Sequence, residues 1–345
     1  MMAHADPIGV IGAGSWGTTL ADLLAAKGYK VDLWVFEEDL CRIIEETREN
    51  TFYLPGAKLS ENLTAHHGLE KVVRGHRILV MVVPSHVYRQ VAVQMAAFVE
   101  PGSIIVSATK GIENDTLLTM SDVLHEVIPA ERGVRMACLA GPSFAKEVIK
   151  REPTAITVAA DDMETARELQ KIFSTNYFRV YTSLDKVGVE LAGALKNVIA
   201  LAAGMCDGLG FGHNSRAALI TRGLSEIARL GVRMGANPLT FSGLSGIGDL
   251  LLTCTGDLSR NRTVGFQLGQ GRKLDEILKE MRMVAEGVKT TRSVYFLAKR
   301  MEVEMPICER IYQILYEGKD PLLAVQELMA RDLKHELGAI ESQLC

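Results

Sequence analysis

Residues 8–18 read Ile8-Gly-Val-Ile-Gly12-Ala-Gly14-Ser-Trp-Gly17-Thr, and they are the strongest indication of the fold. A short apolar run leads directly into three glycines in GxGxxG spacing, and a helix-forming segment follows. Gly12 permits the tight turn, Gly14 lets the backbone approach a pyrophosphate, and Gly17 permits close packing of a helix whose N-terminus faces the anion. The pattern predicts a dinucleotide site. The alternative is a glycine-rich strand-to-helix turn that binds no ligand.

The N-terminal half of the chain alternates short apolar runs with helix-period segments, which is typical of a parallel, doubly wound sheet. We therefore predict an α/β Rossmann-type domain over residues 1–184. The expected strands are Ile8–Ile11, Val31–Trp34, Ile78–Val83, Ser103–Ser107, Met136–Leu139, Ala155–Val158 and Phe178–Tyr181. The expected helices between them are Thr18–Lys27, Val87–Phe98, Leu117–Val127 and Met163–Ser174.

From Asp185 onward the strand signal fades, and successive helical segments are separated by glycine-rich or polar breaks. This pattern predicts an all-α, substrate-binding domain over residues 185–345. Asn214 or Ser215 is expected to cap a long helix, and Asp320 before a proline is expected to start one of the last helices. Because no Pro- or Ser-rich linker separates the two halves, we expect a large contact and a cleft between them.

Composition excludes several classes of partner. The chain has 345 residues, which favours two hydrophobic cores, and its formal charge of −4 leaves no cationic field for a nucleic acid or an acidic membrane. The six cysteines are scattered without CxxC or zinc-ligand spacing, so we expect free thiols and no metal. The longest apolar stretch, residues 191–205, contains a lysine and is too short to span a bilayer. With no signal-peptide pattern at the N-terminus, we expect a cytoplasmic protein.

The acidic run Phe36-Glu37-Glu38-Asp39 follows the second expected strand, where this fold presents an acid to the adenosine ribose. Carboxylates there repel the 2′-phosphate of NADP, so the sequence favours NAD, with Phe36 stacked against adenine. The alternative is that these acids form only the solvated first turn of the next helix.

Two lysines stand in contexts that suit a site. Lys110 follows an expected strand, at the end where doubly wound sheets gather ligands. Lys196 lies in an apolar segment on a helical face that it shares with Gly193, Ala200 and Gly204. Small neighbours leave this lysine shielded from water and open to a close contact. The alternative is a surface lysine that extends from a core helix.

Two later segments supply an acid and an anion site. Asp249 follows a glycine-rich turn, and Ser259-Arg260-Asn261 offers a planar guanidinium flanked by neutral donors, a combination suited to phosphate. Taken alone, each segment is also compatible with an ordinary loop, and so is the turn at residues 141–147.

Together these residues form a recognisable pattern. The chain resembles the glycerol-3-phosphate dehydrogenases of prokaryotic type from residue 8 to about residue 338. The resemblance rests on six motifs in family order: GAGSWGT (12–18), GPSFAKE (141–147), ELAGALKNVIALAAG (190–204), GIGDLLLTC (246–254), DLSRNRTVG (257–265) and AEGVKT (285–290).

The resemblance implies an enzyme that interconverts dihydroxyacetone phosphate and sn-glycerol 3-phosphate with NAD(H) or NADP(H) and supplies glycerol 3-phosphate for phospholipid synthesis. We also expect a homodimer through the helical half, although the sequence does not determine the oligomeric state. It implies that Lys196 transfers the proton. The implied substrate contacts are Lys110, Gly141, Ser143, Lys196, Asp249, Ser259, Arg260 and Asn261. The implied cofactor contacts, with the loop glycines Gly12, Gly14 and Gly17, are Ser15, Trp16, Phe36, Tyr53, Lys110, Ala145, Arg260, Val284 and Glu286.

One departure from the family concerns cofactor choice. Many bacterial-type members carry a basic residue or histidine near position 36, whereas Phe36-Glu37 here is similar to the eukaryotic cytosolic type. This difference favours NAD and leaves dual specificity open.

Hydride transfer to a ketone leaves an alkoxide that needs a proton, and Lys196 is the candidate donor. Burial and repulsion from Lys110 are expected to lower the pKa of Lys196, while Asp249 opposes that shift. Three other interpretations remain: a related dehydrogenase acting on a hydroxy acid or a pantoate-like substrate, a non-catalytic dinucleotide sensor, and a helix-rich structural protein.

Overall fold

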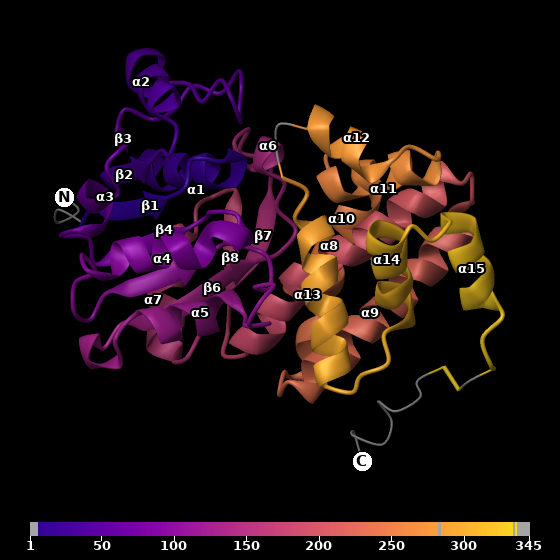
Figure 1. The fold of residues 1–345 in the computed structure, drawn as a ribbon. Coiled ribbons are helices and arrows are strands. Elements are labelled where there is room, and N and C mark those ends of the chain that lie inside the picture. The colour runs from indigo at the N-terminus through magenta and orange to yellow at the C-terminus, as the bar shows by residue number, and fades with distance from the viewer. Residues whose placement is uncertain (1–5, 282–283, 334, 337–345) are drawn as a thin grey trace.

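An eight-stranded sheet fills the N-terminal half of the chain in the computed structural model, which describes residues 6–281, 284–333 and 335–336 (Figure 1). Its spatial order is β3-β2-β1-β4-β5-β6-β7-β8, and the order 3-2-1-4-5-6 is that of a dinucleotide-binding fold. The strands are β1 Ile8–Ile11, β2 Val31–Trp34, β3 Leu63–His66, β4 Ile78–Met81, β5 Ile104–Ser107, β6 Arg135–Ala140, β7 Thr154–Ala160 and β8 Phe178–Ser183.

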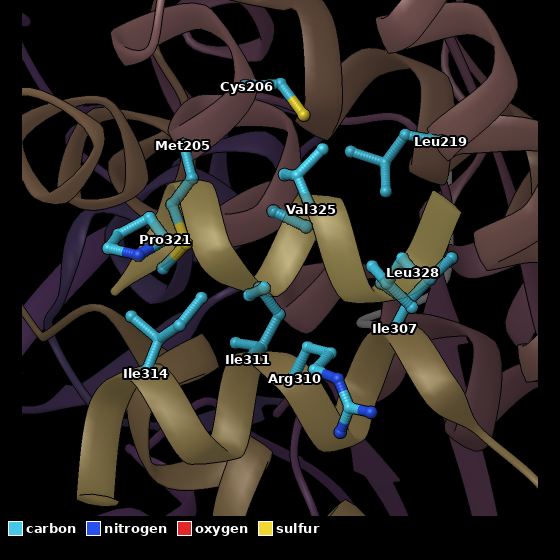
Figure 2. Close-up of a pocket in the computed structure, with 12 residues that line it drawn as sticks. Met205, Cys206, Leu219, Ile307, Arg310, Ile311, Ile314, Pro321, Val325 and Leu328 are labelled. Carbon is cyan, nitrogen blue, oxygen red and sulfur yellow. The ribbon is translucent and has the colours of Figure 1, made fainter. Parts of the chain in front are cut away.

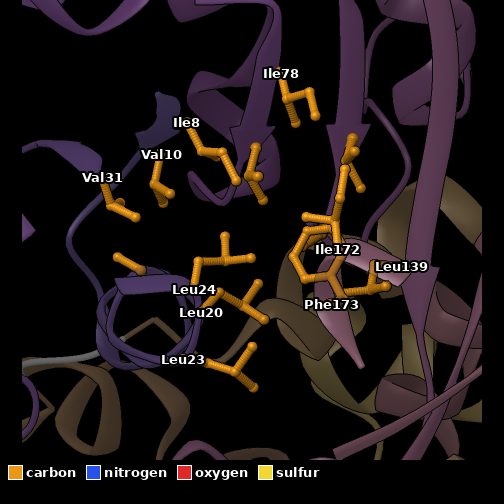
Figure 3. Close-up of a cluster of buried hydrophobic side chains, with 14 of the residues drawn as sticks. Ile8, Val10, Leu20, Leu23, Leu24, Val31, Ile78, Leu139, Ile172 and Phe173 are labelled. Atoms are coloured by element: carbon orange, nitrogen blue, oxygen red, sulfur yellow. The ribbon is translucent and has the colours of Figure 1, made fainter. Parts of the chain in front are cut away.

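Helices cover both faces of this sheet. They are α1 Ser15–Ala26, α2 Glu38–Thr47, α3 Leu69–Val73, α4 Tyr88–Ala96, α5 Met120–Val127, α6 Ala145–Val148 and α7 Met163–Phe173. Strand side chains alternate between the two faces: Ile8 and Val10 pack with α1 and α7, whereas Ile11 packs with α3, α4 and α5. Figure 3 shows the first of these cores, in which α1 leucines meet Ile172 and Phe173 of α7 beneath the strands. Both faces are buried, which explains why β1 and β4 are continuously apolar.

The predicted Rossmann-type fold class is confirmed, with two corrections to the sheet. The sequence analysis missed β3, because Leu63-Thr-Ala-His66 alternates between buried and partly exposed positions at the sheet edge and lacks a continuous apolar run. The sheet is also not wholly parallel, because β6 and β7 pair antiparallel. Residues 141–153 between them hold only the four-residue α6, so the chain does not cross the sheet before it returns.

The C-terminal half is helical, as predicted (Figure 1). Its helices are α8 Lys186–Gly208, α9 His213–Arg233, α10 Asp249–Thr255, α11 Arg260–Gly269, α12 Leu274–Glu280, α13 Glu286–Arg300, α14 Pro306–Glu317 and α15 Pro321–Met329. Asp320 caps α15, as expected, by accepting a hydrogen bond from the backbone N–H of Leu323 at 2.9 Å. The predicted cap of α9 is wrong, because the helix starts earlier: Gly212 is its N-cap, and Asn214 and Ser215 lie in the first turn.

Helix α8 is the core of the helical half, and α9, α10, α11, α13 and α14 all pack on it. The helix is longer than the apolar run noted in the sequence, and by length and composition it is able to cross a membrane. Its apolar stretch is, however, entirely buried inside the protein, as in the core helix of a folded domain. A lysine at its centre is therefore held in a fixed, water-poor setting.

Candidate active site

The glycine loop between β1 and α1 has the geometry that its sequence predicts. Gly12 has φ of +115°, a conformation that favours glycine, and a Cβ there would lie 2.8 Å from the carbonyl oxygen of Val82. A Cβ on Gly17 would lie 1.9 Å from the carbonyl oxygen of Gly12, so any side chain would push the helix off the turn. Gly14 differs, because a Cβ there would meet no atom within 4 Å.

The N-terminus of α1 is left open by this loop. Gly14 is its N-cap, and no side chain caps the helix. The first N–H groups of a helix lack intrahelical partners and bind anions readily. The open space beside Gly14 and the uncapped end of α1 thus fit the pyrophosphate of a dinucleotide.

Tyr53 holds Glu37, one of the acidic residues that follow β2, where the sequence predicts the adenosine ribose. Its hydroxyl donates a 2.6 Å hydrogen bond to Glu37, and its carbonyl oxygen accepts one from Ser15 of the glycine loop at 2.7 Å. Burial and the adjacent carboxylate raise the pKa of Tyr53 to about 12. The solvated-turn alternative holds for Glu38 and Asp39, which lie in the first turn of α2, but Glu37 is held toward the loop. Phe36 is 71% exposed and packs edge-on against Trp34.

Two lysines meet on one buried carboxylate at the boundary of the two halves. Lys110 Nζ lies 2.7 Å from Asp249 Oδ2, and Lys196 Nζ lies 2.9 Å from Asp249 Oδ1. Lys196 also donates to Thr253 Oγ1 at 2.7 Å, and Lys110 donates to the carbonyl oxygen of Gly141 at 3.3 Å. An ammonium has three N–H donors, so each lysine keeps one donor beyond these contacts with the described residues.

The surroundings of Lys196 set its protonation. Burial lowers the pKa of Lys196 to about 8, Asp249 opposes this shift, and repulsion from Lys110 adds to it. These are the direction and the causes that the sequence predicted. The small face of α8 lies against Lys110, because an ideal Cβ position on Gly193 is 3.7 Å from Lys110 Cγ, an ordinary van der Waals distance.

The segment Ser259-Arg260-Asn261 forms the N-terminus of α11. Ser259 is its N-cap and accepts from the backbone N–H of Arg262 at 3.3 Å. Asn261 is more committed than expected, because it donates to Asn197 Oδ1 at 2.9 Å and accepts from the N–H of Gly287 at 2.9 Å. Arg260 is exposed and makes no hydrogen bond to the residues that the structure describes. Desolvation of its guanidinium by the surrounding protein lowers its pKa, and the charge of Glu286 opposes this shift.

Of the remaining predicted residues, Glu286 joins the two halves, and the others have contacts within one half. Glu286, at the start of α13, accepts from the hydroxyl of Ser85 at 2.6 Å and so joins the helical half to the loop after β4. Burial raises the pKa of Glu286, and the charge of Arg260 opposes the rise. Ala145 opens α6, and its carbonyl oxygen contacts Thr19 of α1. The hydroxyl of Ser143 donates to the carbonyl oxygen of Gly141. Trp16 packs near Phe178, and Val284 lies just before α13.

The sequence analysis missed Thr253 and Asn197 as members of the site. Thr253 lies four residues after Asp249 on α10, and Asn197 directly follows Lys196 on α8. Helical spacing places residues i and i+4 on one face, and this signal identifies Thr253 once α10 is recognised as a helix.

No group of three or more His, Cys, Asp or Glu side chains suited to a metal occurs among the described residues. The described cysteines, Cys41, Cys138, Cys206, Cys254 and Cys308, are free thiols, and Cys345 lies outside the described residues. A small cavity of about 40 Å³ lies elsewhere, lined by residues of α8, α9, α14 and α15 such as Met205, Ile311 and Val325 (Figure 2). Its lining is almost wholly apolar, and none of the predicted site residues borders it.

Comparisons with known proteins agree with this geometry. Residues 7–166 match the family model of the NAD-dependent glycerol-3-phosphate dehydrogenase N-terminus, and residues 185–326 match that of its C-terminus. A glycerol-3-phosphate dehydrogenase [NAD(P)+] of Syntrophobacter fumaroxidans is 66% identical over 97% of this chain and 99% of that protein.

Two solved structures extend the comparison. The glycerol-3-phosphate dehydrogenase of Coxiella burnetii has a TM-score of 0.91 at 39% identity, over 95% of this chain and 100% of that one. The enzyme of that name from Saccharomyces cerevisiae has a TM-score of 0.81 at 29% identity, over 94% of this chain and 99% of that one. The resemblance predicted from the six motifs is confirmed: the chain belongs to the NAD-dependent glycerol-3-phosphate dehydrogenase family, the NAD(P)-dependent oxidoreductases that interconvert dihydroxyacetone phosphate and sn-glycerol 3-phosphate.

Proposed function

We propose that the chain carries out this reaction at the boundary between the sheet and the helical half, with Lys196 as the proton donor and acceptor. The observation that carries the proposal is the pair of lysines on Asp249, at 2.7 and 2.9 Å. Each lysine keeps an N–H donor for a substrate oxygen, and both lie on the border between the dinucleotide fold and the helical half. The non-catalytic and structural alternatives leave this buried ion triad without a role.

The proton chemistry follows from the pKa of Lys196, which is about 8. At neutral pH most of the lysine is protonated, so it can give a proton to the oxygen that develops negative charge at C2 of the ketone. Above about pH 8 the neutral amine can accept the hydroxyl proton in the reverse direction. Asp249 and Thr253 hold Nζ in place during both steps. A bound nicotinamide dinucleotide supplies or accepts the hydride.

The phosphate of the substrate is assigned to the N-terminus of α11. Arg260 offers a guanidinium that makes no hydrogen bond to the described residues, and the helix end adds backbone donors. Asn261 has one amide N–H beyond its bonds to Asn197 and Gly287, and the hydroxyl proton of Ser259 is not used by its capping bond. A phosphate is favoured here over the hydroxy acid or pantoate-like substrates because the site gathers several donors at one helix end.

The cofactor is assigned to the glycine loop and the Glu37 edge. The uncapped end of α1 would hold the pyrophosphate, and exposed Phe36 would pack against adenine. Glu37, oriented by Tyr53, favours NAD because its charge repels a 2′-phosphate. We assign Ser15, Trp16, Ala145, Val284 and Glu286 to the same cofactor site; the hydrogen bond between Glu286 and Ser85 across the two halves supports this for Glu286.

The proposal also covers the domain organisation, the location and the oligomeric state. We assign residues 1–184 and 185–345 to a cofactor domain and a substrate domain, since the last strand ends at Ser183, α8 begins at Lys186, and the largest apolar cluster of each half is built almost wholly from that half. A cytoplasmic location, a role in supplying phospholipid synthesis and a homodimer through the helical half complete the proposal. The free thiols among the described residues support a reducing compartment.

The test is a spectrophotometric assay of purified protein with dihydroxyacetone phosphate, comparing NADH with NADPH. We expect turnover with both cofactors and a higher kcat/KM with NADH. Turnover of a hydroxy acid or ketopantoate in place of dihydroxyacetone phosphate would overturn the substrate assignment. Absence of turnover with every substrate would return the protein to the class of dinucleotide sensors.

A further inference from the structure

We propose that Asp207 and Arg262 are positioning residues that lock the anion-binding end of α11 at a fixed place beside Lys196. This inference rests on the proposed function, because it takes the substrate phosphate as the anion at that end. Neither residue belongs to the predicted site. Asp207 lies on α8, the helix that carries Lys196, and Arg262 lies on α11, the helix that begins with Arg260.

Helices α8 and α11 touch backbone to backbone. Each helix contributes two glycines four residues apart, Gly204 and Gly208 on α8 and Gly265 and Gly269 on α11. A Cβ at these four positions would lie between 2.0 and 2.4 Å from a carbonyl oxygen of the other helix. Ordinary helix pairs are held 8–10 Å apart by their side chains. At this contact no side chain lies between the two backbones. The spacing of the two helices is therefore fixed, because no side chain can move to change it.

The pairing also shows how the two helices run. Gly204 lies against Arg262, and Gly208 lies against Phe266, so both helices advance in the same direction. The N-terminus of α11 is therefore level with the middle of α8, next to Lys196 and Asn197. The hydrogen bond of 2.9 Å from Asn261 to Asn197 confirms this placement.

The glycine contact fixes the spacing, and Asp207 fixes the rotation and sliding of α11. Its Oδ2 accepts from Arg262 Nε at 2.9 Å, with Nη2 also at 2.9 Å, and its Oδ1 accepts from Arg216 of α9 at 2.8 Å. The Asp207 side chain is only 6% exposed. A charge so buried needs its partners, so a single carboxylate ties α8, α9 and α11 together.

Arg262 also contacts a second carboxylate, Asp257, at 3.0 Å, and the Asp257 side chain is 96% exposed. A buried and an exposed partner of the same arginine can therefore be compared. An exposed ion pair adds little to stability or geometry, whereas a buried one constrains both groups. The two aspartates therefore share one arginine, and only Asp207 connects it to the helix of Lys196.

The experiment compares Asp207→Asn with Asp257→Asn. The measurements are kcat, the KM values for dihydroxyacetone phosphate and NADH, Tm, and competitive inhibition by inorganic phosphate. For Asp207→Asn we expect the KM for dihydroxyacetone phosphate and the inhibition constant of phosphate to rise together by about ten-fold, as small displacements of a binding group do. The KM for NADH should stay within about two-fold. Asp257→Asn should match the wild type in all of these.

Arg262→Lys provides the second variant if Asp207→Asn does not fold, since it keeps the charge and loses the paired contact to the carboxylate. It should show the same joint rise. A fall in Tm with unchanged KM and phosphate inhibition would overturn the inference and leave Asp207 a stabilising residue alone. Failure of the proposed function looks different, because the wild type itself would then not turn over dihydroxyacetone phosphate.

Discussion

The glycine loop and the lysine cluster are built in opposite ways. The loop comes from one unbroken stretch, residues 8–18, and most of its constraints are local: the positive φ of Gly12, the open space at Gly14 and the contact of Gly17 with Gly12. The exception is the close approach of Gly12 to Val82, just after β4. The lysine cluster joins Lys110, Lys196 and Asp249, which come from distant parts of the chain and two different halves of the molecule.

This difference implies that cofactor binding and proton transfer depend on different kinds of contact. Backbone groups at the end of α1 form the centre of the cofactor side, so binding there should depend mainly on backbone shape and on the open space beside Gly14. Side chains whose charges depend on one another form the lysine cluster, so it should respond to changes of charge and of pH.

Lys196→Met should separate catalysis from cofactor binding most clearly. Removing a general acid or base costs roughly 10²–10⁴-fold in rate, so kcat should fall by that factor. The loop is remote from this change, so the dissociation constant of NADH, measured by fluorescence, should stay near that of the wild type. Methionine retains the apolar stem, and Tm should change little.

The pH profile of Lys196 sharpens this test. In the direction of glycerol 3-phosphate oxidation the lysine must be neutral, so kcat/KM should rise with pH and level off above about 8, the pKa of Lys196. In the reduction direction the lysine must be protonated, so kcat/KM should fall above that pH. The rising limb should be absent from Lys196→Met. If the variant keeps both its rate and this limb, Lys110 becomes the next candidate for the proton.

Arg260→Ala should weaken substrate binding. A hydrogen bond to a charged group contributes about 1.5–3 kcal/mol, so the KM for dihydroxyacetone phosphate should rise by roughly 10–100-fold. If Arg260 also contacts the cofactor, the KM for NADH should rise too. The control is Arg272→Ala, which removes an exposed arginine paired with Glu280 at 2.6 Å and should leave both KM values unchanged. Unchanged values in Arg260→Ala would make it a surface residue.

Gly14→Ala and Gly17→Ala should break the loop in two different ways. Gly14 has φ of −65°, and its Cβ position is open, so alanine should leave Tm unchanged but raise the dissociation constant of NADH by about ten-fold, by occupying the pyrophosphate space. Alanine at Gly17 would clash at 1.9 Å with the carbonyl oxygen of Gly12, so Tm should fall as well. NADH affinity that is unaltered by Gly14→Ala would show that the dinucleotide does not approach this turn.

Glu37→Gln should produce the smallest effect, a several-fold loss of the preference for NADH over NADPH in kcat/KM. The matched variant is Tyr53→Phe, which removes the same 2.6 Å hydrogen bond but keeps the negative charge, and should change the preference less. A wild-type preference for NADPH of about ten-fold or more would contradict the assignment of Glu37.

The sequence alone determined the parts of this protein whose causes are local. The GxGxxG turn, most of the strands and the cap of α15 depend on residues close together in the chain, so their patterns predicted them well. The sequence also indicated that Lys196 is shielded, because small and apolar residues recur around it at helical spacing. It failed at β3 and at the antiparallel β7, where the edge position and a short connection outweigh local propensity.

Which charges meet became visible only in the folded molecule. No local pattern shows that Asp249 lies between two lysines, that Tyr53 holds Glu37, or that Asn261 is already bonded to Asn197. The same holds for the glycine contact that sets α11 against α8 and for the carboxylate of Asp207 that secures it. Such contacts depend on helix packing at distances of a few ångströms, and charge interactions change steeply over that range.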